Sequence, residues 1–334
     1  MIKLITHSDL DGIGCEILLR YVEGIFGNNV DVTIAEAYNV NKIVEYNLNK
    51  LENGEYTKLF ITDLSISNEL AKRIDDNMNV ILLDHHPSAE FLNKYKFANV
   101  ITESTRGKTC GTSLLASYYH VFLQHANPQL VEFVELVRQY DTWEWKNKYN
   151  NIDAKKLNDL LYILGREKFV NLILKKITND ENLFDETINI ILESKQNEIN
   201  NYINIKENDL IIKEILGYKA GVIMCDMYSS ELGNILSEKH PELDFIAIIK
   251  QNSIGLRCVK DNVNLTEIAK HFGGGGHKKA SGFPLNNVKL NTFINDIFDI
   301  IIQPPLYQQY IQDLYIYLYT DSFYMILRRY IFYQ

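Results

Sequence analysis

Three short apolar runs near the start of the chain each end in Asp or His side chains, and this repetition constrains the fold more than any other feature. The runs are residues 3–6, 59–62 and 80–83, and the side chains that follow them are His7, Asp9, Asp11, Asp63, Asp84, His85 and His86. Such runs predict buried parallel strands. Because ligands gather at the carboxyl ends of parallel strands, the pattern predicts one shared site at one edge of a sheet.

The segments between these runs have helical periodicity, which predicts βαβ units and a parallel sheet covered by helices. The expected helices are residues 12–26, 40–51, 67–77 and 110–124. From about residue 152 to 208 strand signals fade, and the pattern is typical of helices that link two bodies. We therefore predict an α/β fold in which an N-terminal parallel-sheet domain with flanking helices and a helical linker covers residues 1–205.

A second alternation of strands and helices follows, and it predicts a smaller C-terminal α/β domain over residues 206–303. Its expected strands are 220–224, 245–249 and 254–258, and its expected helices are 229–239, 264–271 and 290–302. Residues 304–334 form a tyrosine-rich tail with a different composition. It could be a packed helix, a membrane-surface or partner-binding segment, or a coding artefact, and we assign it no catalytic role.

Composition excludes several classes of protein. The chain has 334 residues, is 46% hydrophobic, and has a net charge of −9. The charge argues against a protein that coats long nucleic acids, although divalent ions would still allow a small anionic ligand to bind. Four widely spaced cysteines form no CxxC pair and are interpreted as buried thiols in a reducing compartment. No apolar stretch is long enough for a membrane span, so we expect a cytoplasmic protein without membrane contact.

The Asp and His side chains offer enough ligands for two metal ions. In an extended stretch, the alternate positions of His7, Asp9 and Asp11 would point to one side. Asp63 is the candidate bridge between the metals, and Asp141 follows a helix that could return to the same crevice. Carboxylate and imidazole ligands without thiolate favour Mn²⁺, with Mg²⁺ or Co²⁺ as alternatives and zinc not excluded.

Each of these residues also has a structural interpretation. A lone Asp at a strand end is more often a turn or a helix cap, so Asp63 or Asp141 in isolation would decide nothing. Their combination with the triplet and the first cluster favours metal binding. His120, His125 and His240 have no comparable neighbours in the sequence and are interpreted as structural.

A glycine-rich segment at residues 272–283 needs a separate explanation. It contains the run Gly273 to Gly276 followed by His277. Alone, such a run predicts a flexible turn or a hinge. Beside a metal site, its exposed backbone N–H groups could bind a phosphate.

Together these motifs resemble the DHH phosphoesterase superfamily, named after the triplet present here as Asp84-His85-His86. The segment from His7 to Gly12 resembles the first motif of that superfamily, Asp63 the second and Asp141 the fourth. The glycine-rich segment and Arg257 resemble the substrate-binding signature of the C-terminal DHHA1 domain. Within the superfamily, the first motif looks most like NrnB-type oligoribonucleases and RecJ-like nucleases, because family II pyrophosphatases have a wider spacing. The resemblance covers about residues 1–303.

The resemblance implies a role for each residue. One metal would be held by His7, Asp9 and Asp63, and the other by Asp11, Asp63, His85 and Asp141. Asp84 would orient histidine, and His86 would contact the phosphate or protonate the leaving oxygen. Substrate binding would involve the C-terminal residues Arg257, Gly274, Gly275, Gly276, His277, Lys278 and Ser281.

From these features we predict a two-metal phosphodiesterase that hydrolyses short single-stranded RNA or DNA oligonucleotides to mononucleotides. The resemblance favours an oligoribonuclease-like exonuclease. The alternatives are a phosphatase for 3′-phosphoadenosine 5′-phosphate, a phosphodiesterase for cyclic dinucleotides, and a catalytically silent nucleotide sensor. The substrate would thus be a short oligonucleotide or a small nucleotide. The sequence does not decide between a monomer and a homodimer.

Overall fold

The computed structural model describes residues 1–75, 77–120 and 127–285, and these form two compact units. The first unit covers residues 1–196 and the second begins at Asn197. The division falls inside the helix α8 (Glu186–Lys206). His125, the expected helix 290–302 and the tyrosine-rich tail lie outside the described residues.

The first unit is built on a five-stranded parallel sheet in the order β2-β1-β3-β4-β5. Its strands are β1 (Ile2–Thr6), β2 (Val30–Ile34), β3 (Lys58–Thr62), β4 (Val80–Asp84) and β5 (Ala98–Val100). β1, β3 and β4 are the three apolar runs of the sequence. In the register, Thr6 pairs with Thr62, so β1 and β3 end at the same level. The expected parallel sheet is confirmed.

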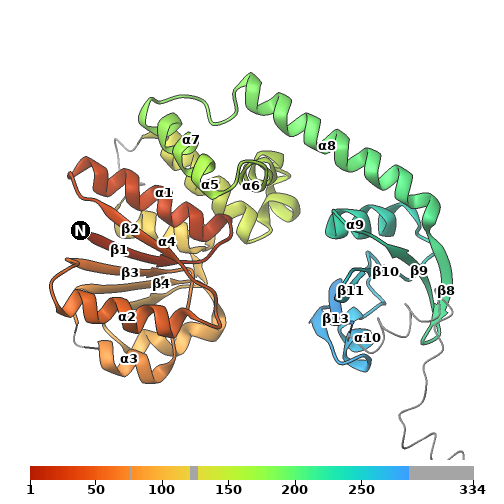
Figure 1. Ribbon diagram of the computed structural model, residues 1–334, viewed down its shortest axis with the longest axis horizontal. Helices are drawn as coiled ribbons and strands as arrows, with labels where there is room; N and C mark the ends of the chain where they lie inside the picture. The colour runs from red at the N-terminus through yellow and green to blue at the C-terminus, as the bar shows by residue number, and fades with distance from the viewer. Residues whose placement is uncertain (76, 121–126, 286–334) are drawn as a thin grey trace, which may run out of the picture. The chain divides into compact units, whose positions relative to one another are not determined.

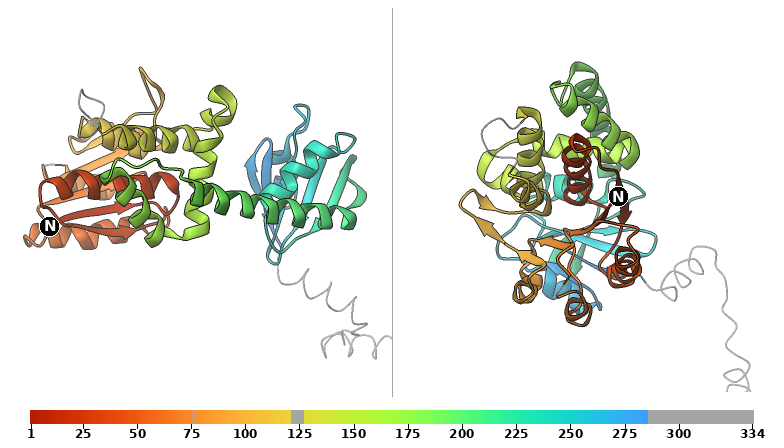
Figure 2. Two further views of the ribbon diagram at one scale, coloured as in Figure 1. Left: turned by 90° about the horizontal axis from the view of Figure 1, so that it is seen from above. Right: turned by 90° about the vertical axis from the view of Figure 1, so that its left-hand side faces the viewer.

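Helices cover both faces of this sheet (Figures 1 and 2). One layer comprises α1 (Leu10–Ile25), α4 (Gly111–Tyr118), α5 (Pro128–Asp141), α6 (Ile152–Leu164) and α7 (Arg166–Thr178). The other comprises α2 (Val40–Glu52), α3 (Asn68–Ile74) and the 3₁₀ helix η1 (Pro87–Lys94). Successive strand residues face opposite layers, so Leu4 packs in the first core and Ile5 in the second.

The helices differ from the expected ones mainly at their ends. α1 begins at Leu10 rather than at residue 12, because Asp9 caps its N-terminus. α3 and α4 end earlier than expected, at Ile74 and Tyr118. The linker is helical as expected and consists of α6, α7 and α8. None of the helices in the described part of the chain is long and apolar enough to span a membrane.

The second unit has a six-stranded mixed sheet in the order β12-β13-β11-β10-β9-β8, in which β9 and β10 are parallel. The strands are β8 (Ile211–Ile215), β9 (Tyr218–Met224), β10 (Phe245–Ile249), β11 (Ser253–Arg257), β12 (Gly275–His277) and β13 (Ala280–Pro284). α9 (Ser229–Lys239) packs on one face and α10 (Leu265–His271) on the other. Between α8 and β8 lies a short 3₁₀ helix, η3 (Glu207–Asp209).

The glycine-rich segment is not a free loop, which corrects the sequence expectation. Gly275–His277 pairs with Ala280–Pro284 as an antiparallel hairpin. A Cβ at Gly274 would lie 2.1 Å from the carbonyl oxygen of Gly282, and Gly276 has a φ of +135°. Close backbone packing and a positive φ therefore require glycine at these two positions.

Candidate functional site

The eight candidate metal and catalytic residues of the first unit gather at the carboxyl edge of its sheet. They form three overlapping groups whose ligand-type atoms lie within 4.8 Å of one another within each group. The groups are His7, Asp9 and Asp63; Asp11, His85 and Asp141; and Asp63, Asp84, His85 and His86. The shared edge that the three apolar runs predict accounts for seven of these residues, and the eighth, Asp141, is the last residue of α5.

The first motif reaches this edge by a different route from the expected extended stretch. His7 follows β1, Asp9 is the N-cap of α1, and Asp11 lies in the first turn of that helix. The Asp9 carboxylate accepts a hydrogen bond from the Gly12 N–H at 3.1 Å. A Cβ at Gly12 would lie 2.1 Å from the carbonyl oxygen of His7. Gly12 is therefore needed because two backbone segments approach closely there.

Asp11 is fully buried and is anchored by the N-terminus of α4. Its two carboxylate oxygens accept hydrogen bonds from the backbone N–H groups of Gly111 at 2.6 Å and Thr112 at 2.8 Å. The Thr112 hydroxyl donates to the Asp11 carbonyl oxygen at 2.7 Å. Helix N-termini stabilise carboxylates in this way. The anchor is separated from Asp11 by 100 residues in sequence, and no local pattern predicted it.

Asp63 occupies the centre of the cluster. One of its carboxylate oxygens lies 3.2 Å from His85 Nε2, and the other lies 3.8 Å from His7 Nδ1. The residue has a φ of +55°, a conformation that is uncommon outside glycine, and its N–H donates to the Leu83 carbonyl oxygen at 3.0 Å. Strain of this kind is typical of functional sites.

The triplet at the end of β4 divides its side chains between two tasks. Asp84 is buried, and its Oδ1 accepts from His86 Nδ1 at 2.7 Å and from the His85 N–H at 2.8 Å. His85 Nε2 lies 3.6 Å from an Asp141 carboxylate oxygen and 3.9 Å from one of Asp11. The His86 side chain is 52% exposed. Asp84 thus fixes an accessible imidazole, while His85 lies among carboxylates.

Crowding of carboxylates makes this edge strongly electronegative. Burial, followed by the charges of Asp11 and Asp9, raises the pKa of Asp63 well above its usual range. The same causes raise the pKa of Asp141 to about 8. Burial also acts on Asp9, but its hydrogen bonds with His7 and Gly12 prevail and lower its pKa.

The histidines respond to the same field. The hydrogen bond with Asp9 raises the pKa of His7 to about 9, although burial opposes it. The hydrogen bond with Asp84 likewise raises the pKa of His86. Burial lowers the pKa of His85 despite the nearby Asp11 charge.

Glu36 is a residue of this site that the sequence did not single out. It lies just after β2, and its carboxylate is 3.1 Å from His7 Nε2. It belongs to none of the three ligand groups. Glu36 therefore contacts a candidate metal ligand, His7, and is not itself a candidate ligand.

Two observations indicate that the donor set fits divalent cations. Asp63 Oδ2 and Asp84 Oδ2 are buried and have no hydrogen-bond partner among the described residues. Within the described part of the chain, histidines are the ion-pair partners of four carboxylates of the site: Asp9, Asp11, Asp63 and Asp141. Buried carboxylates require a compensating charge, and oxygen and imidazole ligands suit Mn²⁺ or Mg²⁺.

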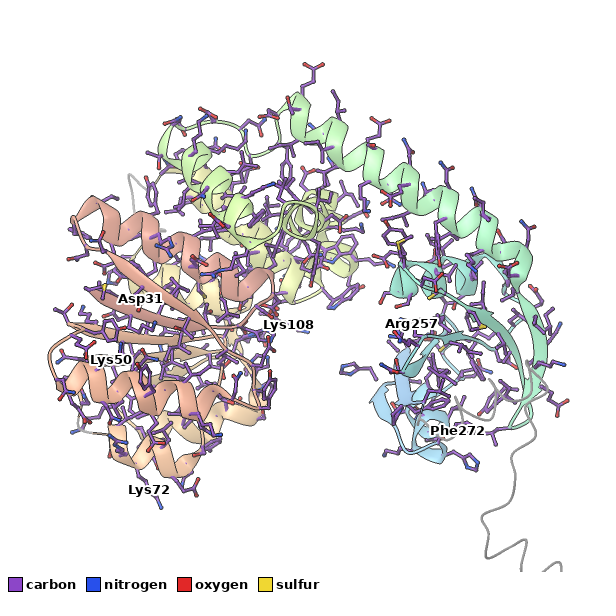
Figure 3. All side chains as sticks on the ribbon, in the orientation of Figure 1. Asp31, Lys50, Lys72, Lys108, Arg257 and Phe272 are labelled. Carbon is purple, nitrogen blue, oxygen red and sulfur yellow. The ribbon has the colours of Figure 1, made fainter. Side chains whose placement is uncertain are left out.

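The candidate substrate residues lie in the second unit, where they fall into two sets. Arg257 and Ser281 line a pocket of about 420 Å³ on the β11 and β13 side of the sheet, together with Lys250. Figure 3 labels Arg257, whose guanidinium donates to the Ser230 hydroxyl at 3.1 Å. The others are outside this pocket, on β12 and the turns beside it: Gly274, Gly275, Gly276, His277 and Lys278.

The remaining sequence interpretations concern residues outside the cluster. His240, in the second unit, pairs with Glu207 at 2.9 Å and with Glu242 at 3.2 Å. The four cysteines are free and buried, as expected: Cys15, Cys110, Cys225 and Cys258. His120 lies just after α4 and belongs to none of the three ligand groups.

Comparison with known proteins connects this geometry to a family. Residues 1–163 match the model of the DHH family, N-terminal domain. The chain is 35% identical over 311 residues to oligoribonuclease NrnB of Bacillus subtilis, and the match covers 90% of this chain and 77% of the relative. The chain belongs to the DHH family.

Two solved structures also match the chain, at low identity. The pGpG-specific phosphodiesterase PggH from Vibrio cholerae is 15% identical with a TM-score of 0.49, over 89% of this chain and 97% of that one. RecJ from Thermus thermophilus, in complex with Mn²⁺, is 15% identical with a TM-score of 0.46, over 87% of this chain and 50% of that one. Both likenesses are too distant to assign a substrate to this DHH protein.

Proposed function

We propose that the chain is a metal-dependent phosphodiesterase that hydrolyses short single-stranded oligonucleotides to mononucleotides. The observation that carries the proposal is the overlap of the three ligand groups, two of which share Asp63 and two of which share His85. The relative at 35% identity is named an oligoribonuclease, which supports an oligonucleotide substrate and favours RNA.

In this proposal, two divalent ions occupy the cluster, with Mn²⁺ as the preferred ion and Mg²⁺ or Co²⁺ as alternatives. His7, Asp9 and Asp63 hold one ion, and Asp11, Asp63, His85 and Asp141 hold the other. Bound ions of this kind activate a water molecule and neutralise the charge that develops on the phosphoryl oxygens.

The chain's own groups supply the remaining steps. Asp84 accepts the Nδ1–H of His86, which leaves Nε2 to contact the phosphate or to donate a proton to the leaving oxygen. The raised pKa of His86 favours the protonated form that such a donor requires. The accessible position of His86 is consistent with this role, whereas the buried Asp84 acts through it.

The second unit has a separate part in the proposal. Within the proposed DHHA1 domain, residues 206–303, Arg257, His277 and Lys278 provide charge-assisted hydrogen bonds to a phosphate of the substrate. Ser281 lies beside Arg257 in the same pocket. The glycines Gly274, Gly275 and Gly276 allow the hairpin backbone to approach that phosphate.

Hydrolysis of 5′-labelled RNA and DNA oligomers of graded length, with Mn²⁺, Mg²⁺ or a chelator, tests the proposal directly. We expect metal-dependent conversion of the shortest RNAs to mononucleotides. Inactivity at every length, with each metal, would contradict the proposed reaction and redirect the search to small nucleotides or to a binding function.

A matched pair of variants tests the assigned site. We expect Asp84→Asn, which keeps the shape of the side chain, to lower kcat at least about 100-fold, because His86 loses its ionic partner. His240→Asn should leave kcat unchanged, since the ion-pair partners of His240 are acids of the second unit. Equal rates for the two variants would argue against the assigned role of the triplet.

A further inference from the structure

Within the first unit, a surface of exposed aromatic and basic side chains adjoins the cluster of candidate metal ligands. It is formed by the hairpin of β6 (Glu103–Ser104) and β7 (Gly107–Lys108) and by the segment from Trp143 through the π-helix η2 (Trp145–Tyr149). The side chains of this aromatic-basic surface are Arg106, Lys108, Trp143, Lys146, Lys148 and Tyr149. All of them are exposed, in a chain whose net charge is −9.

Two short tethers connect this surface to the cluster. Trp143 is two residues after Asp141, so their Cα atoms lie within about 7 Å. Lys108 is three residues before Gly111, whose N–H donates to the Asp11 carboxylate at 2.6 Å. Figure 3 labels Lys108 at the side of the first unit toward which β1 runs. The aromatic-basic surface is therefore adjacent to the candidate metal ligands Asp141 and Asp11.

A buried arginine joins the two halves of the surface. Arg138 is only 4% exposed, donates to the Lys108 carbonyl oxygen at 2.9 Å, and also donates to the Glu144 carboxylate. Glu144 is itself mostly buried, and it forms ion pairs with Arg138 beneath the surface and, at 3.4 Å, with Lys148 of the surface. Of the acids on the hairpin, Glu103 lies opposite Lys108 in the strand register.

Trp143 is the most unusual member of this surface. Its side chain is 56% exposed, and its φ of +60° is a conformation that bulky residues rarely adopt. Hydrogen bonds hold this turn, including one from the Trp143 N–H to the Tyr140 carbonyl oxygen at 3.1 Å. The ring lies 6.1 Å from that of Trp145, which in turn stacks on Tyr140 at 6.4 Å. The packed rings of Tyr140 and Trp145 thus support the exposed indole of Trp143.

We propose that the aromatic-basic surface binds the nucleotide next to the scissile bond, with the Trp143 indole stacked on its base and Arg106 and Lys146 beside its phosphates. Single-stranded nucleic acids are commonly bound by this combination of stacking platforms and basic side chains. A few cations suffice for a short substrate, which agrees with an acidic chain. The inference rests on the proposed oligonucleotide hydrolysis and adds a base-recognition site to it.

Kinetics on a trinucleotide, and on the same trinucleotide lacking one base, test the stacking. We expect Trp143→Ala to lower kcat/KM about 5- to 150-fold, mainly through KM, and Trp143→Phe to lose less. On the substrate lacking the stacked base, wild type and Trp143→Ala should have equal kcat/KM. Tyr46→Ala is the matched control, because Tyr46 is 62% exposed on α2, which belongs to the other layer of the sheet. It should leave kcat/KM unchanged.

Two results would overturn the inference. One is a kcat/KM for Trp143→Ala within twofold of wild type on every trinucleotide. The other is the same loss on substrates with and without the base at each position, which would indicate a structural effect of the substitution.

Binding measurements separate this inference from the proposed reaction. In Trp145→Phe, Trp143 is the one tryptophan of the chain, so its fluorescence reports stacking without turnover. We expect oligonucleotides to quench it in the presence of a chelator, and Arg106→Ala with Lys146→Ala to reduce the salt slope of binding by about 1.4 for two lost phosphate contacts. Quenching without hydrolysis would refute the reaction but support the surface. Hydrolysis without quenching would support the proposed reaction but refute the binding of the base by this surface.

Discussion

His7 presents its two ring nitrogens to different partners. Nδ1 lies 2.9 Å from an Asp9 carboxylate oxygen within the candidate ligand group, while Nε2 lies 3.1 Å from Glu36. The Ser8 hydroxyl donates to the other Glu36 oxygen at 2.7 Å. When a histidine binds a metal through one ring nitrogen, a carboxylate that accepts the N–H of the other ring nitrogen fixes the tautomer and orientation of the imidazole. Glu36 is therefore a positioning residue for His7.

We expect Glu36→Ala to weaken Mn²⁺ binding about 10- to 100-fold, because the imidazole loses its fixed orientation. Glu36→Gln should recover most of the affinity, since the amide oxygen can still accept the Nε2–H. Calorimetric titration of the metal-free protein with Mn²⁺ measures both. The control is Glu45→Ala, which removes an exposed carboxylate paired with Arg73. Equal Mn²⁺ affinities for all three variants would disprove the positioning role.

The raised pKa values at the cluster predict how the stability of the metal-free protein depends on pH. Asp141 has a folded-state pKa of about 8, above its value of 3.8 in an unfolded chain, so the folded state binds the proton more tightly. Its contribution to the free energy of unfolding is present below about pH 4 and is lost as the pH rises through 8. The raised pKa of Asp63 acts in the same direction.

We therefore expect the free energy of unfolding of the chelator-treated protein to decrease between about pH 5 and pH 8, as measured by urea denaturation. Asp141→Asn should show a smaller decrease, because the substituted side chain does not titrate. Added Mn²⁺ should stabilise wild type most at the upper end of this range, where the carboxylates are ionised. A pH dependence that is the same in wild type and Asp141→Asn would contradict this account.

At this scale, a residue could be predicted from the sequence where it follows a strong local pattern. Asp63 and the triplet follow apolar strands, and parallel pairing brings them to one edge. Glu36 follows β2, a short strand of alternating apolar and polar residues that was not predicted from the sequence, so the position of Glu36 at a strand end was not recognised. The anchoring of Asp11 by Gly111 is a tertiary contact, and only the folded chain reveals it.

At the scale of elements, α1 illustrates how one glycine holds a motif together. A Cβ at Gly12 would lie 2.1 Å from the His7 carbonyl oxygen and 2.7 Å from the His7 nitrogen, both backbone atoms that cannot move aside. We expect Gly12→Ala to displace the start of α1, to destabilise the protein by about 1–3 kcal/mol, and to abolish tight Mn²⁺ binding. Urea denaturation and calorimetric titration measure the two effects.

Gly24, near the other end of the same helix, provides the control. A Cβ there would have no atom within 4 Å. Gly24→Ala should stabilise the protein by about 0.5–1 kcal/mol, because alanine favours the helix, and should leave Mn²⁺ binding unchanged. If the two alanine variants behaved alike, the close contact between Gly12 and His7 would not be what holds the motif.

The elements themselves were partly predictable. Strong periodicity predicted α9 at the observed bounds and placed α1 and α2 within two residues. β8 was missed, because it is a largely exposed edge strand without a clean alternation of apolar and polar residues. The glycine-rich hairpin was interpreted as a loop, because glycine lacks the side-chain pattern by which strands are recognised.

At the scale of the whole molecule, the hydrophobic cores follow the division into two units. The two core clusters on either side of the parallel sheet include residues up to Leu192 and none of the second unit. Of the two clusters of the second sheet, one begins with Ile199 and Ile203 of α8 and the other with Ala220, and neither includes a residue of the first unit. The fading of strand signals after about residue 152 had already predicted two bodies linked by helices. The position of the division inside a continuous helix has no sequence signal, because α8 remains helical through it.

Because no described core cluster spans the division, we expect the two units to unfold in separate thermal transitions. All eight candidate metal and catalytic residues belong to the first unit, so Mn²⁺ should raise the midpoint of one transition only. At about a hundredfold excess over Kd the stabilisation is about 2.7 kcal/mol, which corresponds to about 5–10 °C for a unit of this size. Differential scanning calorimetry with and without Mn²⁺ measures both midpoints. Asp63→Asn should remove the shift while keeping two transitions, whereas a single transition that moves as a whole would show that the units unfold together.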